Sequence, residues 1–352
     1  MSSSSILITG GAGFIGSHTC LLLLECGYEL FVVDSLINSS QISLKKVLAL
    51  LKFKGIFAEC KLHFRQGDIR NIQFLDNVFK EAKNMNKEIV NIIHFAGLKS
   101  ISDSFKENLS YWDTNVSGSL NLLNIMNKHN CRTIVFSSSA GIYDKSKNGL
   151  IKETGEKRPN SPYGKTKLAV ENILNDQFLY SNKDWKIATL RYFNPIGAHP
   201  SGFIGEDPKF KKDNIFPKII DSAFHKNKLT IYGQDWATHD GTPIRDYIHV
   251  MDIAYGHLKA LDFIKVKKRV KIALNLGTGN GITVLDLIKN FEKYNNVKVS
   301  YEFKERRQGD VEKLVADNSL AHNMLNWTSK MSVKDMCQDG WRWKLNNPKG
   351  YV

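Results

Sequence analysis

Short apolar runs alternate with amphipathic segments along the first half of the chain. Between the runs, apolar positions recur every three or four residues, as they do on one face of a helix. Strands that alternate with helices are typical of a parallel sheet with helices on both faces. The pattern therefore predicts an α/β fold with a Rossmann-type, doubly wound sheet. The runs of strand length are residues 5–9, 30–34, 61–65, 90–95, 133–138 and 186–193.

After residue 193 the pattern changes. Residues 194–213 are rich in Gly, Pro and charge, which indicates an ordered loop that leaves the sheet. We therefore expect an NAD-binding domain over 1–193 and a smaller α/β substrate domain over 194–352, part of which, within 243–277, is a candidate to return to the first sheet. The later segments predict helices near 214–225, from about 250 and near 283–293, strands at 229–232, 273–277 and 297–303, and a helical, aromatic-rich tail from 317 to 344.

Composition points to an ordinary globular protein. Of 352 residues, 42% are hydrophobic and 24% charged, and no apolar stretch approaches the roughly 20 residues of a membrane span. The N-terminal MSSSS lacks the basic start of a secretion signal. Five scattered cysteines form no Cys-x-x-Cys, so neither a disulfide framework nor a zinc site is indicated. We expect a cytoplasmic protein that does not bind membranes.

A net charge of +14 raises the question of nucleic acid. The basic residues are, however, spread along the chain, and the densest runs lack interleaved aromatic residues. No His-Glu-x-x-His occurs among the ten histidines. The sequence therefore predicts neither a nucleic-acid partner nor a metal.

The first strand runs directly into a glycine-rich turn. Gly11, Gly13 and Gly16 form Gly-x-Gly-x-x-Gly ahead of an amphipathic helix, and Gly10 precedes them. Such a turn lets backbone N–H groups approach a pyrophosphate at the helix N-terminus. The next strand ends in Asp34, whose carboxylate can accept from both ribose hydroxyls and would repel a 2′-phosphate. The pattern favours NAD over NADP.

The spacing Tyr-x-x-x-Lys occurs four times, starting at Tyr143, Tyr163, Tyr255 and Tyr294. The segments after the first and last have no sustained helical period, and the third lies far along the chain from the glycine-rich turn. Only the second follows a helix start, Ser-Pro, so that its lysine lies one turn along the same helical face. We select this pair as the catalytic candidate.

Hydride transfer from an alcohol requires a base for the hydroxyl proton. Tyr163 could serve if its pKa, about 10 when unperturbed, fell by roughly 3 units, which corresponds to about 4 kcal/mol. We expect the ammonium of Lys167, the helix N-terminus and the oxidised nicotinamide to favour the phenolate. The preceding strand ends in Ser137, Ser138 and Ser139, and the last of these is the candidate to orient the substrate alcohol.

These motifs, in this order, resemble the extended short-chain dehydrogenase/reductase family and, within it, the UDP-glucose 4-epimerases. The likeness covers essentially the whole chain. It implies interconversion of UDP-galactose and UDP-glucose through a 4-keto sugar, with transient reduction of tightly bound NAD, and a homodimer formed by helices near 104–127 and 163–178. The motifs are TGGAGFIG, HFAGLK, SSSA, SPYGKTK, RYFNPIGAHPSG, GTPIRDYIHVMD and RRQGD.

The resemblance also implies residue roles. Tyr163 takes the O4 proton, Ser139 assists, and Lys167 lowers the tyrosine pKa and holds the nicotinamide ribose. The residues implied to contact NAD are Gly10, Gly11, Gly13, Phe14, Ile15, Gly16, Asp34, Asn38, Ser39, Asp68, Ile69, Phe95, Ala96, Gly97, Lys99, Asn115, Ser139, Tyr163, Lys167 and Tyr192. Those implied to contact the UDP-hexose are Lys99, Ser139, Tyr163, Asn194, Asn214, Ile215, Tyr232, Arg245, Arg307, Asp310 and Leu314.

Two positions differ from the family pattern, and a third lies where the family's side chain varies in size. Gly141 stands where threonine is usual and Asp144 where glycine is usual, which removes one expected hydroxyl contact to substrate. Leu314 occupies the position where a large side chain restricts the enzyme to UDP-Glc and UDP-Gal and a small one admits N-acetylated sugars. We expect the restricted specificity, with UDP-GlcNAc/UDP-GalNAc epimerisation as the alternative.

Two further alternatives belong to other classes. A nucleotide-sugar 4,6-dehydratase shares the first half of the pattern, but its elimination needs an extra acid/base pair beside the serine strand, and SSSAGIY contains none. A non-catalytic NAD sensor would bind the dinucleotide without turning over any UDP-hexose.

Overall fold

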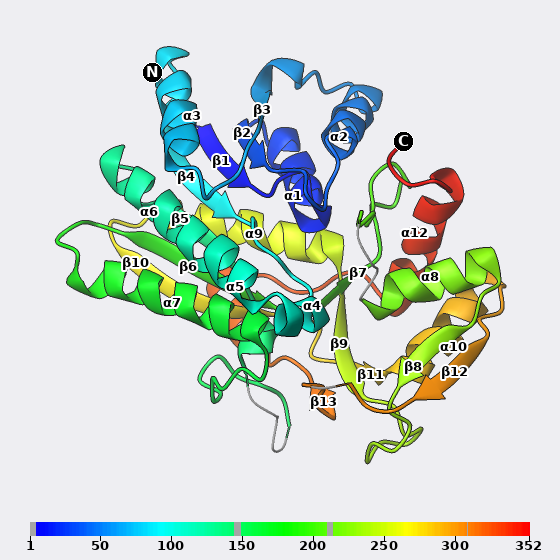
Figure 1. Ribbon diagram of the computed structural model, residues 1–352. Helices are drawn as coiled ribbons and strands as arrows, with labels where there is room; N and C mark the ends of the chain where they lie inside the picture. The colour runs from blue at the N-terminus through cyan, green and yellow to red at the C-terminus, as the bar shows by residue number, and fades with distance from the viewer. Residues whose placement is uncertain (1–4, 144–148, 210–213, 308) are drawn as a thin grey trace.

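A computed structural model describes residues 5–143, 149–209, 214–307 and 309–352. Its centre is a parallel sheet of seven strands in the order β10-β6-β5-β4-β1-β2-β3 (Figure 1). The expected doubly wound α/β fold is thereby confirmed. The starting residues MSSSS lie outside the described part except for Ser5.

The secondary structure has the following bounds. The strands are β1 (Ser5–Thr9), β2 (Glu29–Asp34), β3 (Leu62–Gln66), β4 (Ile89–His94), β5 (Thr133–Ser139), β6 (Lys186–Tyr192), β7 (Asn194–Ile196), β8 (Leu229–Tyr232), β9 (Ile244–His249), β10 (Val270–Leu276), β11 (Gly281–Thr283), β12 (Tyr301–Lys304) and β13 (Lys313–Leu314). The α-helices are α1 (Phe14–Glu25), α2 (Ile42–Phe53), α3 (Ile72–Asn84), α4 (Ile101–Lys106), α5 (Asn108–Tyr111), α6 (Gly118–Lys128), α7 (Pro162–Tyr180), α8 (Ile215–His225), α9 (Val250–Lys265), α10 (Val284–Asn295), α11 (Ser319–Leu325) and α12 (Val333–Asn346). The described residues also form two 3₁₀ turns, η1 (Glu59–Lys61) and η3 (Ala140–Ile142), and a π-helical segment, η2 (Trp112–Ser117).

The central strands are apolar because both faces of the sheet are covered. Successive residues of one strand pack into different cores: Ile6 and Ile8 lie with α1, α2 and α9, whereas Leu7 lies with α3, α6 and α7. Figure 1 shows α6 and α7 on one side of the sheet and α9 on the other. Burial on both faces is why these strands are continuous hydrophobic runs.

The edge strand β10 comes from late in the chain. It pairs with β6 in parallel register from Val270 opposite Lys186 to Leu276 opposite Tyr192. The preceding helix α9 packs against α1, β5 and β6. Part of the segment 243–277 thus lies in the first sheet, while the domain boundary at 193 stays a prediction.

The remaining strands build a second lobe. β7, β11 and β13 all pair with β9, and β8 pairs with β12. Helices α8, α10 and α12 cover these small sheets around a core that includes Phe216 and Phe291. Because β7 follows β6 after one residue, the second lobe adjoins the carboxyl ends of the central strands.

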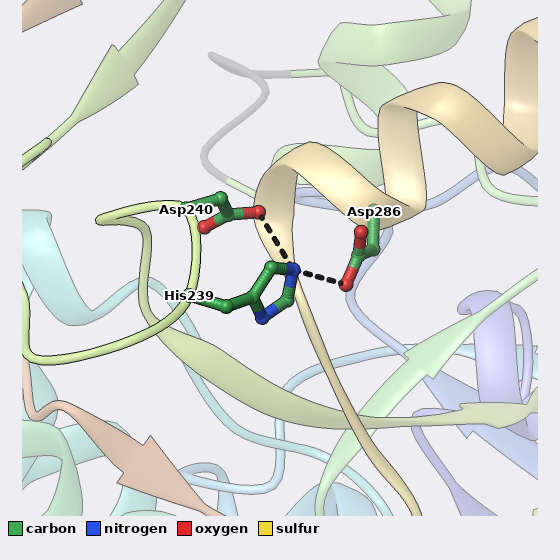
Figure 2. Close-up of side chains that lie close together, drawn as sticks. All are labelled: His239, Asp240 and Asp286. Atoms are coloured by element: carbon green, nitrogen blue, oxygen red, sulfur yellow. Dashed lines mark ion pairs between the residues drawn. The ribbon is translucent and has the colours of Figure 1, made fainter.

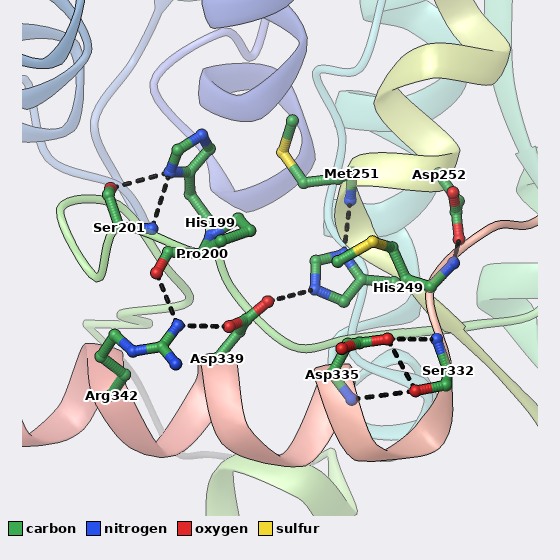
Figure 3. Close-up of polar contacts among 11 residues, drawn as sticks. His199, Pro200, Ser201, His249, Met251, Asp252, Ser332, Asp335, Asp339 and Arg342 are labelled. Carbon is green, nitrogen blue, oxygen red and sulfur yellow. Dashed lines mark hydrogen bonds and ion pairs between the residues drawn. The ribbon is translucent and has the colours of Figure 1, made fainter.

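A polar cluster attaches the C-terminal helix α12 to the end of β9 and to the loop after β7 (Figure 3). His249, at the end of β9, contacts Asp339 of α12 at 3.3 Å and accepts the N–H of Met251. Asp339 also accepts from Arg342, which donates in turn to the carbonyl of Pro200. The loop after β7 is therefore held in place by α12.

Several short elements differ from expectation. The sequence pattern missed β7, β9, β11 and β13, and the strand expected over 297–303 covers only Tyr301–Lys304. None of the helices in the described ranges has the length and apolarity that a bilayer crossing requires.

Candidate active site

The glycine-rich turn lies between β1 and α1 in a conformation that requires glycine. Gly10 has φ +72°, and a Cβ there would lie 2.6 Å from the backbone nitrogen of Ala96. A Cβ on Gly16 would lie 2.4 Å from the carbonyl oxygen of Gly10. Gly13 is the N-cap of α1, and no described side chain caps its first amides. A bare helix N-terminus under glycine backbone fits a pyrophosphate, and Phe14 and Ile15 form the first turn.

Asp34 connects this turn to the loop after β2. One carboxylate oxygen accepts the N–H of Ala12 at 3.0 Å, and the other accepts from Leu36 N–H and Ser39 Oγ at 2.9 and 2.8 Å. Asn38 lies in the same loop. The acid is thus held at the strand end beside the glycine turn, where it fits a dinucleotide ribose.

The next predicted positions follow β3. Asp68 is paired with Arg70 at 2.8 Å, and this hydrogen bond lowers the pKa of the carboxyl despite partial burial. Ile69 is buried, and a Cβ on Gly118 of α6 would lie 2.6 Å from it. Asp68 is therefore oriented by its own loop, and its contact with adenine stays a prediction.

The segment after β4 is bound to the helices that follow. Asn115 accepts the N–H of Leu98 at 2.7 Å and donates to the Leu98 carbonyl and to Thr166 Oγ1 of α7. A Cβ on Gly97 would lie 2.9 Å from the Asn115 amide oxygen. The predicted residues from Phe95 to Gly97 thereby lie directly beside the helix that carries Tyr163.

Lys99 has a partner that the sequence did not suggest. Its ammonium lies 2.9 Å from Glu206 Oε1, and Asn214 donates to the same oxygen at 3.4 Å. Two predicted ligand-binding residues, Lys99 and Asn214, thus meet at one acid. Ile215 follows as the first residue of α8. No motif in the sequence marks Glu206, because it lies in an irregular loop.

The proposed catalytic residues converge at the ends of β5 and α7. Ser161 caps α7 by accepting the N–H of Gly164 at 3.1 Å, and Pro162 is the first helical residue. Tyr163 then lies near Ser139, and the serine side chain lowers the proton affinity of the phenol. Lys167 lies one turn further, its ammonium 2.9 Å from the carbonyl of Ser137 and 6.0 Å from the Tyr163 ring centre.

Burial changes the proton affinities of these groups. Burial raises the pKa of Tyr163, and the nearby side chain of Ser139 opposes this only in part. Burial lowers the pKa of Lys167 to about 8, against the opposing charge of Glu171. Protein groups alone therefore do not produce the lowered tyrosine pKa expected from the sequence.

Other copies of the spacing have different surroundings. The hydroxyl of Tyr143 donates to Asn275 at 2.7 Å inside a buried network, and its lysine lies outside the described residues. Lys259 lies over the ring of Tyr255 at 5.3 Å, on α9. The carbonyl of Tyr294 accepts from Gln338. Among the described residues, no side-chain interaction joins any of these three tyrosines to Ser139.

Gly141 and Tyr192 border the catalytic cluster. A Cβ on Gly141 would lie 3.4 Å from Ser139 Oγ and 3.8 Å from the Tyr163 ring, so a larger residue has ordinary contact distances there. The Tyr192 hydroxyl hydrogen bonds with Ser137, and burial raises its pKa. Asp144, the second departure from the family pattern, lies outside the described residues.

Predicted substrate residues gather in the second lobe. Arg245 of β9 is paired with Asp310 at 3.0 Å. The Arg307 guanidinium lies 4.1 Å from the ring centre of Tyr232, where an open cleft of about 510 Å³ is lined by these two residues and by residues 304–306. Cationic groups beside an aromatic ring suit a nucleoside diphosphate.

Two buried polar atoms near this site are unpaired. The Tyr247 hydroxyl and the Asn194 amide oxygen have no hydrogen-bond partner among the described residues. β7 and β9 pair with Asn194 opposite Tyr247, so the two side chains lie next to each other. Alternation along β9 puts Tyr247 on the same face as Arg245. The sequence could have indicated Tyr247 by this alternation, but β9 was not predicted as a strand.

Leu314 is in β13, opposite Arg245 of β9. It is half-buried and packs on the cluster formed by Ala140, Ile142 and Phe193. This places Leu314 between the carboxyl end of β5 and the arginine predicted to bind the diphosphate.

Within the described residues, three side chains could together ligate a cation (Figure 2). His239 lies 3.6 Å from Asp240 and 3.2 Å from Asp286. The carboxylate of Asp240 also accepts from Thr242 and Thr283. These contacts hold the loop that carries His239 and Asp240 against the start of α10, which explains why the three side chains lie together. The expectation that no metal is bound stays a prediction.

Comparisons with known proteins agree on a family. The family model described as GDP-mannose 4,6 dehydratase matches residues 7–340. UDP-glucose 4-epimerase 2 of Arabidopsis thaliana is 44% identical over 353 residues, which cover 99% of this chain and 97% of the relative. The UDP-glucose 4-epimerase of Stenotrophomonas maltophila, solved with bound NAD and formylated UDP-arabinopyranose, is 40% identical with a TM-score of 0.90, covering 98% of this chain and 99% of that one. The Bifidobacterium longum enzyme, in complex with NAD+ and UDP, is 39% identical with a TM-score of 0.91 and the same coverages.

Proposed function

Because the chain belongs to the nucleotide-sugar epimerase/dehydratase family and groups with its UDP-glucose 4-epimerases, we propose that it interconverts UDP-galactose and UDP-glucose. It is an isomerase that uses NAD, the cofactor bound in the related structures. The observation that carries this function is the convergence of Ser139, Tyr163 and Lys167 at the sheet edge beside the glycine turn.

We assign the proton transfer at O4 of the hexose to Tyr163. Its phenolate removes the O4 proton as the C4 hydride leaves, and the resulting phenol returns the proton when the hydride is restored to the opposite face. Ser139, which lies beside Tyr163, orients the sugar hydroxyl. When bound, NAD accepts and returns the hydride, and the positive charge of its oxidised ring favours the phenolate that burial of Tyr163 disfavours.

The dinucleotide is assigned to the glycine turn, Asp34 and the segment after β4. Support comes from the uncapped first turn of α1 and from the carboxylate of Asp34, which is held beside it by Ala12 and Ser39. Lys167 is assigned to the nicotinamide ribose. The further residues assigned to NAD are those named from the resemblance, Asn38, Asp68, Ile69, Phe95, Lys99, Asn115 and Tyr192 included.

The UDP group is assigned to the second lobe. Arg245 and Arg307 supply charge for the diphosphate, and Asp310 suits ribose hydroxyls. We add Tyr247 to this set, because its buried hydroxyl and the amide oxygen of Asn194 lack partners in the described protein. The other assigned residues are Asn214, Ile215 and Tyr232.

We favour epimerisation over dehydration of the sugar, although the matching family model bears the description GDP-mannose 4,6 dehydratase. Elimination across C5–C6 needs an acid and a base near the sugar in addition to Tyr163. The serine strand continues as Ala140, Gly141, Ile142 and Tyr143, none of which carries a carboxylate. The network around Tyr143 contains Glu153, but that carboxylate accepts the N–H of Asn275 inside the protein.

We propose that Leu314 restricts the sugar pocket to UDP-Glc and UDP-Gal. Its position opposite Arg245, packed on Phe193, supports a role beside the hexose rather than beside the uridine. Activity on N-acetylated UDP-sugars is the alternative, and it depends on the same side chain.

We also propose a homodimer and a cytoplasmic location. Leu109, Trp112 and Leu120 are exposed apolar residues at helical spacing along α5, η2 and α6, which supports burial against a second copy. All five cysteines are free, three of them buried, which supports a reducing compartment.

The decisive experiment incubates the purified protein with UDP-Gal and, separately, with UDP-GalNAc, without added NAD. We expect UDP-Glc to form from the first at least about tenfold faster than UDP-GlcNAc from the second, if Leu314 excludes the acetamido group at a cost of about 1.4 kcal/mol or more. Equal rates would contradict the restricted specificity. A protein that carries NAD but converts neither sugar would be an NAD sensor.

A further inference from the structure

A buried ion pair lies directly behind the catalytic cluster. Arg191 of β6 donates from Nε and Nη2 to the two carboxylate oxygens of Glu171, at 2.9 and 2.6 Å. Both side chains are almost fully excluded from solvent. Glu171 is on α7, one helical turn beyond Lys167. A bidentate buried pair is costly to separate, because either partner alone would be an uncompensated charge.

The pair also contacts the strand that ends in Ser139. Ser138 Oγ donates to Glu171 Oε1 at 2.6 Å. The register of β5 and β6 places Ser138 opposite Arg191 and Ser139 opposite Tyr192. One carboxylate therefore joins the two segments that carry the reacting side chains, α7 and the end of β5.

Arg191 extends this connection to the loop beyond Ser139. Its Nη1 donates to the Tyr143 hydroxyl at 2.8 Å and to the carbonyl of Glu153 at 3.0 Å. Tyr143 donates in turn to Asn275 of β10. A single guanidinium and its partner acid thus connect α7, β5 and the segment that carries Tyr143.

We propose that Glu171 and Arg191 are positioning residues of the epimerase reaction, which fix Ser139 relative to Tyr163 and keep Lys167 charged. The proposal rests on the function proposed above. Neither residue is among those assigned to NAD or substrate, and both act through neighbours. Glu171 acts on Lys167 by its charge, whereas Arg191 offsets that charge and holds the carboxylate in place.

The charged and titratable groups around Lys167 allow the two effects to be separated. Tyr163 and Glu171 lie near it on α7, and His94 faces it from β4. Tyr192 of β6 interacts with Tyr163. His257 of α9 contacts Ser137, the residue whose carbonyl accepts from Lys167. Lys157 interacts with both members of the ion pair. Glu171 is the only acid that acts on Lys167 among the interactions of the described residues.

Removing one member of the pair should therefore shift the alkaline limb of the pH–activity profile, the pH range in which activity falls as Lys167 loses its proton. In Glu171→Gln the positive charge of Arg191 is left uncompensated, so the pKa of Lys167 falls and the limb moves to lower pH. In Arg191→Met the charge of Glu171 is left uncompensated, so the limb moves to higher pH. The double variant removes both charges and should return the limb toward its original position.

The test measures kcat and KM for UDP-Gal between pH 6 and 10 in NAD-loaded protein. We expect shifts of about 1 pH unit in opposite directions for the two single variants, a kcat about tenfold lower for Glu171→Gln at pH 8, and KM within about twofold. Glu81→Gln is the matched control, because Glu81 also forms a two-point pair with Arg65, on the surface far along the sheet. It should shift nothing.

Each outcome decides between the alternatives. Parallel losses of kcat at every pH, or shifts in the same direction for both single variants, would reduce the pair to a structural role and overturn the proposal. If a single variant does not fold, Ser138→Ala is tested instead, because it removes only the hydroxyl that joins β5 to Glu171. This variant should have a kcat several-fold lower and an unchanged KM. An unchanged kcat would also overturn the proposal. A wild-type protein that converts no UDP-Gal would instead contradict the proposed function.

Discussion

Tyr163 is distinguished by its neighbours and not by the spacing of its motif. Three other tyrosines precede a lysine by four positions, yet among these four only Tyr163 interacts with Ser139 and lies in the first turn of a helix that begins after Ser-Pro. Its burial raises its own pKa, so its reactivity depends on positive charge nearby. Positive charge near the phenol would favour its ionised form and oppose the effect of burial.

Replacing Tyr163 by Phe should lower kcat for UDP-Gal by about 10²–10⁴-fold, since a positioned acid/base contributes that much. NAD content, measured by absorbance after denaturation, should stay the same. Tyr255→Phe is the matched control, because it removes the hydroxyl from another copy of the spacing. Near-normal turnover in Tyr163→Phe would remove this residue from the mechanism.

Leu314→Ala should raise the ratio of UDP-GalNAc to UDP-Gal turnover by about tenfold, if the leucine fills the space an acetamido group needs. The two rates are measured by separating the products. Lys313→Ala serves as the control, because adjacent strand residues point to opposite faces. An unchanged ratio in Leu314→Ala would show that another residue limits the sugar pocket.

Among the secondary-structure elements, long periodic segments could be predicted and short ones could not. The strands of the first half and helices α7, α8, α9 and α10 followed from hydrophobic pattern and capping residues. β7, β11 and β13 have two or three residues, too few to show a period. β9, IRDYIH, contains the adjacent charged residues Arg245 and Asp246, which interrupt its apolar pattern and hid both the strand and Tyr247.

The candidate catalytic residues and the glycine turn could be selected from the sequence because strand ends and a helix start mark them. Glu206, Glu171 and Arg191 could not, because their contacts are with partners more than 15 positions away. A buried Arg–Glu pair has no local sequence signature. Its members become visible only when strand register places them together.

The start of α7 carries a prediction of its own. Ser161→Ala removes the oxygen that caps Gly164 N–H, which should cost about 1 kcal/mol of unfolding free energy. Because Tyr163 lies in the same first turn, kcat should fall as well. Chemical denaturation and turnover of the variant measure both effects, and Ser161→Asp, which can also cap, should restore stability. Unchanged stability in Ser161→Ala would contradict the capping role.

For the whole molecule, buried histidines set the response to acid. Burial lowers the pKa to about 3 for His18 and His94 and to about 4 for His199 and His257. In the unfolded chain these groups titrate near 6.5, so unfolding takes up protons between pH 6.5 and about 4. Their contribution to stability is complete above pH 6.5 and is lost as the pH falls through this window.

We therefore expect the unfolding free energy to fall by up to about 1.4 kcal/mol per pH unit for each of the four histidines as pH drops below 6.5. Denaturant unfolding at pH 7.5, 6.5, 5.5 and 4.5 measures this slope. The exposed His322 provides a control, since His322→Gln should leave the slope unaltered. A free energy independent of pH over this range would contradict the assignment.

The apolar stripe of Leu109, Trp112 and Leu120 carries the prediction for assembly. Leu109 is 79% exposed. Leu109→Lys should therefore have little effect on a monomer, but it should disrupt a dimer whose interface buries this residue. Light scattering should give twice the chain mass for the parent protein and the single chain mass for the variant. A monomeric parent would refute the homodimer.

The late origin of β10 also has a consequence for synthesis of the chain. β6 ends at residue 192 and its outer neighbour begins at Val270, so 77 residues (269 − 192) must be made before that neighbour begins. At about 5–20 residues per second, the ribosome needs roughly 4 to 15 s to make them. During that interval β6 is an open edge on a nascent sheet, able to pair with another nascent chain. Slow translation of the second lobe would prolong this interval. On crowded polysomes, neighbouring nascent chains could then pair through this edge and aggregate.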